Sequence, residues 1–77
     1  MAGYWKWQTQ AGEARIVPKA GRFHAMIDED DLGSYLTAQQ AVDDLCGGHT
    51  FTPSSGVDTD TLGLPADVAD WEFVRFA

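Results

Sequence analysis

The sequence has 77 residues, of which 44% are hydrophobic and 12% aromatic, and its formal net charge is −7. A chain of this length predicts one domain that buries only roughly 60% of the surface exposed by its unfolded form, which excludes a large ligand cavity. The acidic balance disfavours binding to phosphate backbones, because these attract clustered lysine and arginine side chains.

The N-terminal part, residues 4–28, predicts a three-stranded antiparallel meander. In the first strand, alternation places Trp5 and Trp7 on the same side. Residues 14–18 form a short second strand rich in β-branched side chains, and residues 22–28 form a third strand with alternating apolar positions. Glycine-containing turns join these strands. The polar stretch that follows is expected to be a turn and then a brief extended piece.

Residues 37–46 predict an α-helix with a defined start and stop. Thr37 is a favourable N-cap, and Gln40 has the spacing of a capping box. Leu36 is expected to form a hydrophobic staple on the first turn, and Gly47 is placed to end the helix in a left-handed conformation. An apolar stripe suited to lie on the sheet consists of Ala38, Ala41, Val42 and Leu45.

The last turn of this helix carries Asp43 and Asp44, although the negative end of a helix dipole favours cations. Two internal remedies are open, namely protonated His49 or one of the basic residues Arg15, Lys19 and Arg22. Charge is also segregated along the chain, since residues 1–27 carry +3 and residues 28–77 carry −10. The two aspartates are therefore either paired within the fold or open to a docking partner.

Residues 47–64 are rich in Gly, Ser, Thr and Asp without periodicity, which predicts a long loop. Residues 65–76 predict a helical turn followed by a short strand or an extended tail. The whole chain, 1–77, is thus predicted to be a single α+β domain. It consists of a three-stranded antiparallel meander packed on one α-helix, with the C-terminal turn and strand or tail added.

Several motifs resemble those of a group of small uncharacterised bacterial single-domain proteins. The shared features are an aromatic N-terminal hairpin, a Gly-x-Tyr-x-Ser/Thr-x-x-x-Ala helix start, a Gly-His-Thr turn and a late tryptophan. They are carried here by Gly33, Tyr35, Thr37, Ala41, Gly48, His49, Thr50 and Trp71. That group has no assigned activity, so the resemblance implies a bacterial or phage origin and no particular chemistry.

The same helix start after a three-stranded sheet also resembles plant-type and phage-integrase DNA-binding domains, over about half of the chain. Those domains read DNA through arginine and tryptophan side chains on the sheet. This chain has few basic residues and a strongly acidic remainder, so we expect no direct nucleic acid binding.

The densest charge run consists of Asp28, Glu29, Asp30 and Asp31. A calcium loop of the EF-hand type is excluded, because Leu32 occupies its fifth position and Gln39 its twelfth, where a bidentate carboxylate is needed. The run is either a solvated turn or a surface that recognises a basic partner.

Cys46 and His49 lie three residues apart and could form a thiolate–imidazole couple or half of a metal site. A third member, His24, would have to arrive by folding. The structural alternative is a small apolar cysteine at the helix end and a histidine that closes the loop. One cysteine excludes an intramolecular disulfide framework, and with two histidines it falls short of a four-ligand zinc site. We therefore predict no metal and no cofactor.

The aromatic side chains at the two chain ends either fill the core or form an exposed surface for a partner; they are Trp5, Trp7, Trp71 and Phe73. Two strands with aromatics on one face most naturally cover the same core. Because a single helix is predicted to cover the sheet, one sheet face is expected to stay partly open, as an aromatic patch or a dimer interface.

These features together favour a non-catalytic protein–protein interaction module that meets a protein with a basic surface. The residues expected at its partner surface are Asp28, Glu29, Asp30, Asp31, Asp43, Asp44, Trp5 and Trp7. The alternatives are a phage-derived charge mimic that inhibits a nucleic-acid-binding protein and, last, a small enzyme that uses Cys46 with a histidine. A homodimer, or a dimer that exchanges its C-terminal segments, is also expected. No apolar run approaches the ~20 residues of a membrane span, so we expect no membrane contact and a cytoplasmic location.

Overall fold

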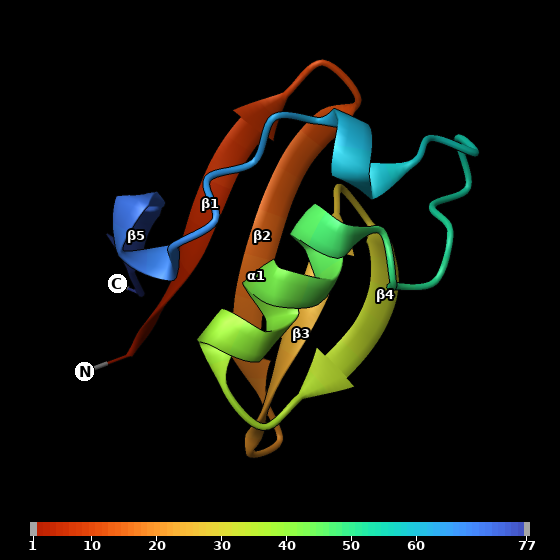
Figure 1. Cartoon of the computed structure of the whole chain (residues 1–77). Coiled ribbons are helices and arrows are strands. Elements are labelled where there is room, and N and C mark those ends of the chain that lie inside the picture. Colours follow the sequence, from red (N-terminus) through yellow and green to blue (C-terminus); the bar gives the residue numbers. More distant parts are fainter. Residues whose placement is uncertain (1, 77) are drawn as a thin grey trace.

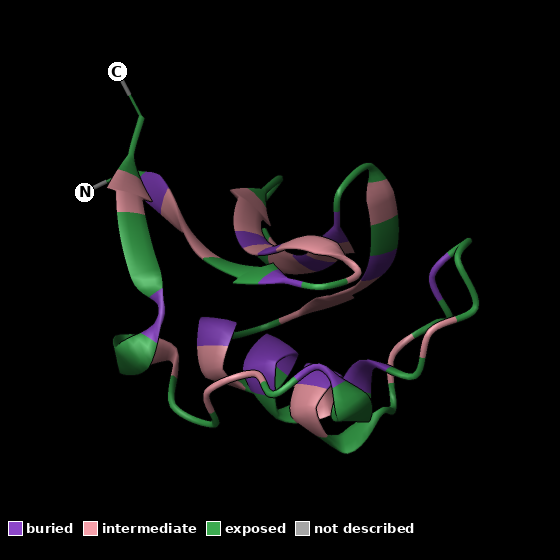
Figure 2. Ribbon diagram, turned by 90° about the horizontal axis from the view of Figure 1, so that it is seen from above, coloured by how far each residue is buried: buried purple, intermediate pink, exposed green. Residues whose placement is uncertain are grey.

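A computed structural model describes residues 2–76 and shows two layers (Figure 1). Within these residues, antiparallel strands form one five-stranded sheet in the order β4-β3-β2-β1-β5. The strands are β1 (Gly3–Thr9), β2 (Gly12–Lys19), β3 (Arg22–Ile27), β4 (Asp30–Tyr35) and β5 (Glu72–Arg75). The second layer contains helix α1 (Ala38–Gly47) and two 3-10 turns, η1 (Thr59–Thr61) and η2 (Val68–Asp70). This layer covers one face of the sheet and leaves the other, the open face, uncovered (Figure 2).

The predicted number of strands was wrong, although the α+β class holds. Four strands form the meander instead of three, because the polar stretch after β3 returns as β4. The turn between them is tight: Asp28 adopts a positive φ of 50°, which aspartate tolerates better than most residues. The pairing of β3 with β4 is also irregular between His24 and Met26, so β4 lacks the regular alternation that reveals a strand.

Strand β5 joins the sheet at its other edge and pairs with β1 from Gly3–Arg75 to Lys6–Glu72. The two strands approach closely at Gly3, where a Cβ atom would collide with the carbonyl oxygen of Val74. The structure thus has a 3-10 turn and a strand in the segment for which a helical turn and a short strand were predicted. The N-terminal and C-terminal ends of the chain consequently lie side by side (Figure 1).

The core lies between α1 and the sheet. The helix contributes its predicted apolar stripe, and the strands contribute alternate side chains of β2 and β3. Leu32 of β4 and Trp71, which precedes β5, complete the core at the two edges of the sheet. The core residues on the helix and on β2 and β3 are Ala38, Ala41, Val42, Leu45, Ala14, Ile16, Ala25 and Ile27. Many of these side chains are small, so helix and sheet pack closely and a short chain fills its core.

The start of α1 is formed as predicted by Thr37, whose hydroxyl accepts the Gln40 N–H at 3.1 Å. The Gln40 side chain accepts the main-chain N–H of Leu36 at 3.2 Å, one residue before the usual capping-box partner. The predicted staple was wrong, since the Leu36 side chain is 68% exposed. The stop was predicted one residue early: Gly48 takes the left-handed conformation and Gly47 ends the helix. Two successive glycines can both serve as a stop, so the sequence does not distinguish them.

The segment after α1 is tied to the edge of β4. The Phe51 N–H donates to the Leu32 carbonyl at 3.0 Å, and the Asp30 carboxylate accepts both the N–H and the hydroxyl of Ser54. Leu62 is buried and closes the segment onto the core. Among residues 2–76, no helix combines the length and apolar character needed to cross a bilayer.

These contacts predict opposite outcomes for the same substitution at two leucines. Leu45→Ala removes a side chain with 0% exposure and should lower the free energy of unfolding by about 2–5 kcal/mol. Leu36→Ala, the matched control, should change it by less than about 0.5 kcal/mol, because Leu36 is 68% exposed. Urea unfolding followed by circular dichroism measures both values. Equal losses would contradict this assignment of the core.

Candidate functional site

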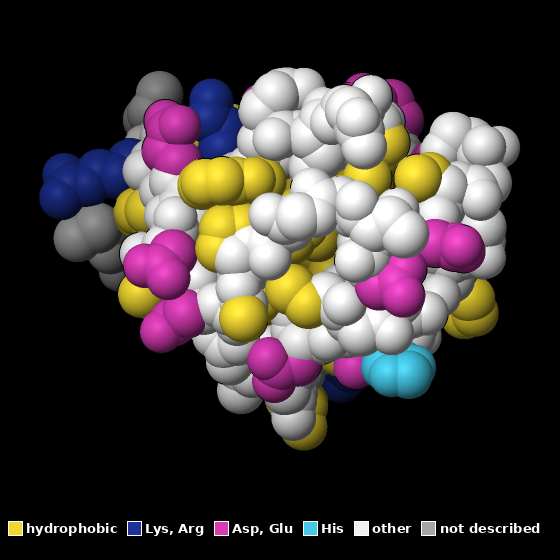
Figure 3. All heavy atoms as spheres, turned by 45° about the horizontal axis from the view of Figure 1, so that its top comes forward, with side chains coloured by type: hydrophobic (Ala, Val, Ile, Leu, Met, Phe, Trp, Pro, Cys, Tyr) yellow, Lys and Arg dark blue, Asp and Glu magenta, His cyan; other side chains and the backbone are white. Residues whose placement is uncertain are grey.

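The layer that covers the sheet is strongly acidic. Between Leu36 and Trp71 the chain contains six aspartates and neither lysine nor arginine. We call this set the acidic layer, and it consists of Asp43, Asp44, Asp58, Asp60, Asp67 and Asp70. Figure 3 shows hydrophobic side chains gathered toward the middle of the molecular surface on this side, with acidic side chains around them. Half-buried apolar residues here include Val57, Leu64 and Val68.

Asp43 and Asp44 make polar contacts with neutral groups. Asp43 accepts from the side-chain amide of Gln39 at 2.8 Å. Asp44 contacts the hydroxyl of Tyr35: burial, together with the hydrogen bond and the negative charge of Asp44, raises the pKa of Tyr35 to about 12. Within residues 2–76, the ion pairs do not include either aspartate. Their charges at the end of α1 therefore lack a nearby cation.

Neither of the two remedies considered for these charges is used. Arg15 donates to the main-chain carbonyl of Asp28 at 2.6 Å, and Arg22 donates to the hydroxyl and carbonyl of Ser34. His49 is exposed and contacts Asp44 through main-chain groups, its N–H donating to the Asp44 carbonyl at 2.9 Å. Lys19 takes part in none of the ion pairs described for residues 2–76, and its charge acts on Asp31.

The acidic run from Asp28 to Asp31, which enters the start of β4, is mostly engaged in the fold. Asp28 accepts the Glu13 N–H at 2.9 Å, and Asp30 holds Ser54, which lowers the pKa of Asp30 through the main-chain and side-chain hydrogen bonds. Asp31 lies 2.7 Å from the ring of His24. Partial burial acts to raise the pKa of Asp31, but it is lowered overall because the Gly33 N–H and His24 bind the carboxylate. Glu29 is exposed, with no such contact described.

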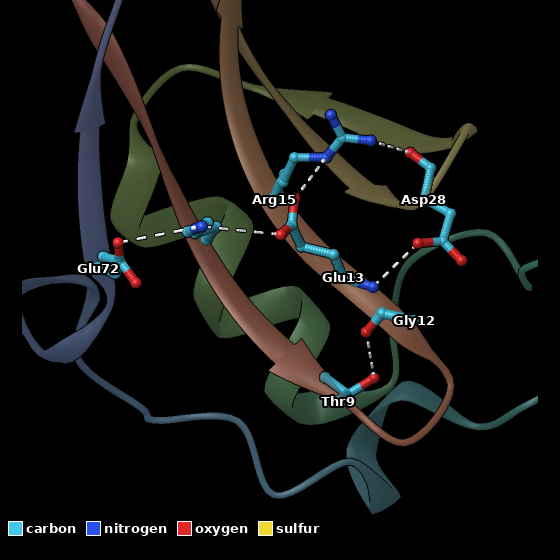
Figure 4. Close-up of polar contacts among 7 residues, drawn as sticks. Thr9, Gly12, Glu13, Arg15, Asp28 and Glu72 are labelled. Carbon is cyan, nitrogen blue, oxygen red and sulfur yellow. Dashed lines mark hydrogen bonds and ion pairs between the residues drawn. The ribbon is translucent and has the colours of Figure 1, made fainter.

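The open face carries a row of alternating charges (Figure 4). Lys6 lies 3.9 Å from both Glu72 and Glu13, and Glu13 lies 3.5 Å from Nε of Arg15. This last contact is an ion pair without hydrogen-bond geometry, and the buried Arg15 Nε has no hydrogen-bond partner among the described residues. With the donation from Arg15 to the carbonyl of Asp28, the row crosses β5, β1, β2 and the end of β3. It lets a sheet face that no helix covers remain stable in water.

The tryptophans lie on the covered side or at its edge. Trp71 is 4% exposed, and its indole N–H donates to the Pro65 carbonyl at 3.0 Å. The Trp5 ring is in contact range of Phe23 and Phe73, with centroids 6.1 and 5.0 Å away. Trp7 is 37% exposed. Trp5 and Trp71 thus serve the core, and Trp7 is the tryptophan of the predicted partner surface that solvent reaches most.

An open cavity of about 290 Å³, which was not predicted from the sequence, lies where β1 extends beyond β5. It is lined by Lys6, Trp7, Gln8, Glu13 and Glu72, and we call it the Trp7 cavity. Its two charged sides are 66 positions apart at Lys6 and Glu72, and only the pairing of the first and last strands brings them together. The alternation in both end strands was visible, but their register was not.

Cys46 is half-buried, and its sulfur lies 3.6 Å from the carbonyl oxygens of Leu64 and Pro65. Burial raises the pKa of the thiol, and the charge of Asp43 raises it further. The group is therefore protonated at neutral pH, which makes it a weak nucleophile and a poor metal ligand. Across residues 2–76, no three His, Cys, Asp or Glu side chains come together in a metal-binding arrangement.

Comparison with known proteins adds no relative. No family model, no curated protein and no solved structure matches the chain. Its function is therefore inferred from the residues and contacts described above.

The two aspartates at the end of α1 should have separable effects on two titrations. Asp44→Asn should lower the pKa of Tyr35 from about 12, because it removes the adjacent charge, whereas Asp43→Asn should leave it unchanged. Tyrosinate absorbance measures this. Because the raised pKa favours neutral Tyr35 in the folded state, stability should be constant below the ordinary pKa of 10.0 and fall as the pH rises toward 12. An equal response to both variants would contradict the assignment.

The reverse pattern is expected for Cys46. Asp43→Asn should lower the pKa of the thiol, and Asp44→Asn should leave it unchanged, because Asp43 is the aspartate that raises it. The rate of alkylation by iodoacetamide as a function of pH reports the pKa. In the native protein the midpoint should lie above 9.0, and in denaturant it should return to that ordinary value. A native midpoint near neutrality would instead identify a reactive cysteine.

Proposed function

We propose that this protein is a non-catalytic protein–protein interaction module that docks through its acidic layer onto a partner with a basic surface. The observation that carries the proposal is the distribution of charge. Six aspartates and no lysine or arginine occupy the segment that forms one side of the molecule, while Lys6 and Arg15 are paired on the opposite side of the sheet. We place this function in the cytoplasm, where the free thiol of Cys46 would stay reduced.

The physical role of the acidic layer is to steer and orient the partner. Unpaired carboxylates on one side attract a basic surface over a distance of about 10 Å, and this attraction raises the association rate. Charges at the rim contribute less to affinity than a desolvated apolar centre does. The half-buried Val57, Leu64 and Val68 supply apolar surface among the aspartates. An apolar centre inside a charged rim is the usual composition of a protein interface.

Two features argue against chemistry at this site. The thiol of Cys46 has a raised pKa and donates to main-chain carbonyls, so it lacks an activating base. His49 is exposed on the loop, and His24 is held by Asp31 on the other side of the sheet. The two histidines thus lie on different sides of the molecule, and this arrangement does not suit a shared catalytic centre.

The charge distribution also suits a second candidate, a mimic that occupies the nucleic-acid-binding surface of its partner. It is favoured by the same six clustered carboxylates, which would replace phosphates on a basic surface. The two candidates differ in one result. A duplex oligonucleotide should compete with the protein for the partner if it is a mimic, and should not compete if the partner's basic surface has another purpose.

Removal of charge from the acidic layer should slow the association with the partner. The partner is first captured from native cells on the immobilised protein and eluted with salt, and its binding is then followed by surface plasmon resonance. Asp60→Asn with Asp70→Asn, two exposed aspartates, should reduce the association rate by roughly tenfold at low salt and flatten its salt dependence.

The control is Glu29→Gln, which removes an exposed carboxylate outside the acidic layer. It should change the association rate much less than the double variant does. The dissociation rate should change little in all of them, because rim charges act mainly on encounter. Association that is equally fast for the double variant and the control would refute docking through the acidic layer.

A further inference from the structure

Strand β5 forms one edge of the sheet and has a neighbouring strand on one side only (Figure 1). Its pairing with β1 is continuous from Glu72 to Arg75, and the strand contains no proline. The strand and the residue after it carry two exposed large apolar side chains, Phe73 at 38% and Phe76 at 49%. A regular, partly apolar edge strand offers a template for another strand. We propose that β5 pairs antiparallel with β5 of a second copy of this chain.

The direction of the main-chain groups identifies the residues that can form this pairing. The Phe76 N–H donates to the Ala2 carbonyl at 3.2 Å, and the Val74 carbonyl also lies against β1. Main-chain groups alternate in direction along a strand, so those of Phe73 and Arg75 point away from β1. Within residues 2–76, β1 is the only strand paired with β5, and no other main-chain bond reaches these two residues.

One register lets both outward-facing residues form main-chain bonds. With Val74 on the two-fold axis, Phe73 of each copy lies opposite Arg75 of the other, and each such pair can exchange both of its hydrogen bonds. An axis at Phe73 would instead place Arg75 opposite Trp71, whose N–H already donates to the Val68 carbonyl at 3.0 Å. The register with Val74 on the axis is therefore favoured.

The side chains are complementary in this register. Phe73 packs on Trp5, with ring centroids 5.0 Å apart, so Phe73 and, by alternation, Arg75 lie on the covered side of the sheet. Each Arg75 guanidinium is thus opposite the Phe73 ring of the other copy, and the two groups can form a cation–π contact. On the open face Val74 lies opposite Val74, and a Phe76 side chain flanks this pair at each end.

The other edge of the sheet does not offer the same match. Strand β4 contains two aspartates and neither lysine nor arginine, so pairing of β4 with itself would bring like charges together. Strand β5 has one glutamate and one arginine. At the β4 edge the Leu32 carbonyl is also occupied by the Phe51 N–H. Self-association is therefore expected at β5.

Pairing through β5 places the covering layers of both copies on the same side of one continuous sheet. Residues directly opposite in antiparallel strands point to the same face, so the two-fold axis is perpendicular to the sheet. The two acidic layers then face the same direction. Two docking surfaces on one dimer raise the apparent affinity for a partner with a wide basic surface. This last consequence rests on the proposed function, whereas the strand pairing does not.

Sedimentation equilibrium of the whole protein tests the pairing without the docking partner. The paired segment is short, so we expect a reversible dimer with a dissociation constant on the order of 0.1 mM. Each copy carries a formal charge of −7, so the dimer should become tighter as salt screens the repulsion between copies. A monomer at every concentration up to about 1 mM would overturn the proposal.

A cysteine on the two-fold axis tests the register. In a Cys46→Ser background, Val74→Cys places two thiols opposite each other at a non-hydrogen-bonded position, where Cα atoms are about 4.5 Å apart and a disulfide can form. Oxidised glutathione should then cross-link the dimer. The matched control is Phe73→Cys, whose thiols lie on a diagonal about 7–8 Å apart and should cross-link much more slowly. Equal rates would overturn the register.

Two substitutions of Arg75 separate the side-chain contribution from the main-chain contribution. Arg75→Ala removes the cation–π contact and should weaken the dimer by roughly fivefold. Arg75→Pro also removes the outward N–H, which pairing with β1 does not use, and should weaken the dimer by roughly tenfold more. Equal dissociation constants for the two variants would contradict main-chain pairing.

Hydrogen exchange in the unmodified protein gives the same test without a substitution. The amide protons of Phe73 and Arg75 should exchange more slowly as the protein concentration rises, because the pairing protects them. The exposed amide of Glu29, outside the pairing, is the control and should exchange at a constant rate. Exchange of Phe73 and Arg75 that is independent of concentration would overturn the pairing.

Failure here can be distinguished from failure of the proposed function. If the protein stays monomeric but the Asp60 and Asp70 substitutions still slow partner association, the β5 pairing is refuted and the acidic layer stands. If the protein dimerises through β5 but those substitutions have no effect, the pairing stands and docking through the acidic layer is refuted.

Discussion

The packing of one short helix against one face of the sheet is the constraint on which the rest of the structure depends. Helix α1 has ten residues and buries one stripe against β2 and β3. The other face of those strands must then be stable in water. It achieves this with a row of ion contacts through Lys6, Glu13 and Arg15. Lys6 and Arg15 are paired there, Arg22 binds Ser34, and within residues 2–76 no ion pair includes an aspartate of the covering layer.

Local signals made the helix predictable, and long-range pairing limited the rest. Thr37 and Gln40 act within one turn of chain, so their capping contact can be inferred from spacing alone. Strand β4 could not be inferred in the same way. Its aspartates have low strand propensity, and they are tolerated because Asp30 binds Ser54, which is distant in sequence, and Asp31 binds His24 on the neighbouring strand. A charged edge strand of this kind also resists pairing with other chains.

The candidate site shows the same division between local and distant information. Six aspartates without a cation can be counted in the sequence, but whether Asp43 and Asp44 are paired depends on where the basic hairpin residues go. The acidic run from Asp28 to Asp31 looked equally suited to a partner, yet Asp28 and Asp30 hold the main chain of distant residues. The count of charges was therefore informative only after the contacts of each were known.

The two edges of the sheet differ in how far their main-chain groups are occupied from within the chain. At the β4 edge, the Leu32 carbonyl accepts the Phe51 N–H, and the Ser34 carbonyl accepts from Arg22. Both carbonyl groups are therefore already occupied from within the chain. At the other edge, β5 covers β1 only to Lys6 and leaves Gln8 beyond its start. The end of β1 beyond Lys6 is therefore an uncovered strand end, with Glu72 on the open face and the Trp7 side chain on the covered face. An uncovered strand end can pair with an extended segment of another chain, whereas the diffuse charge of the acidic layer attracts any basic surface.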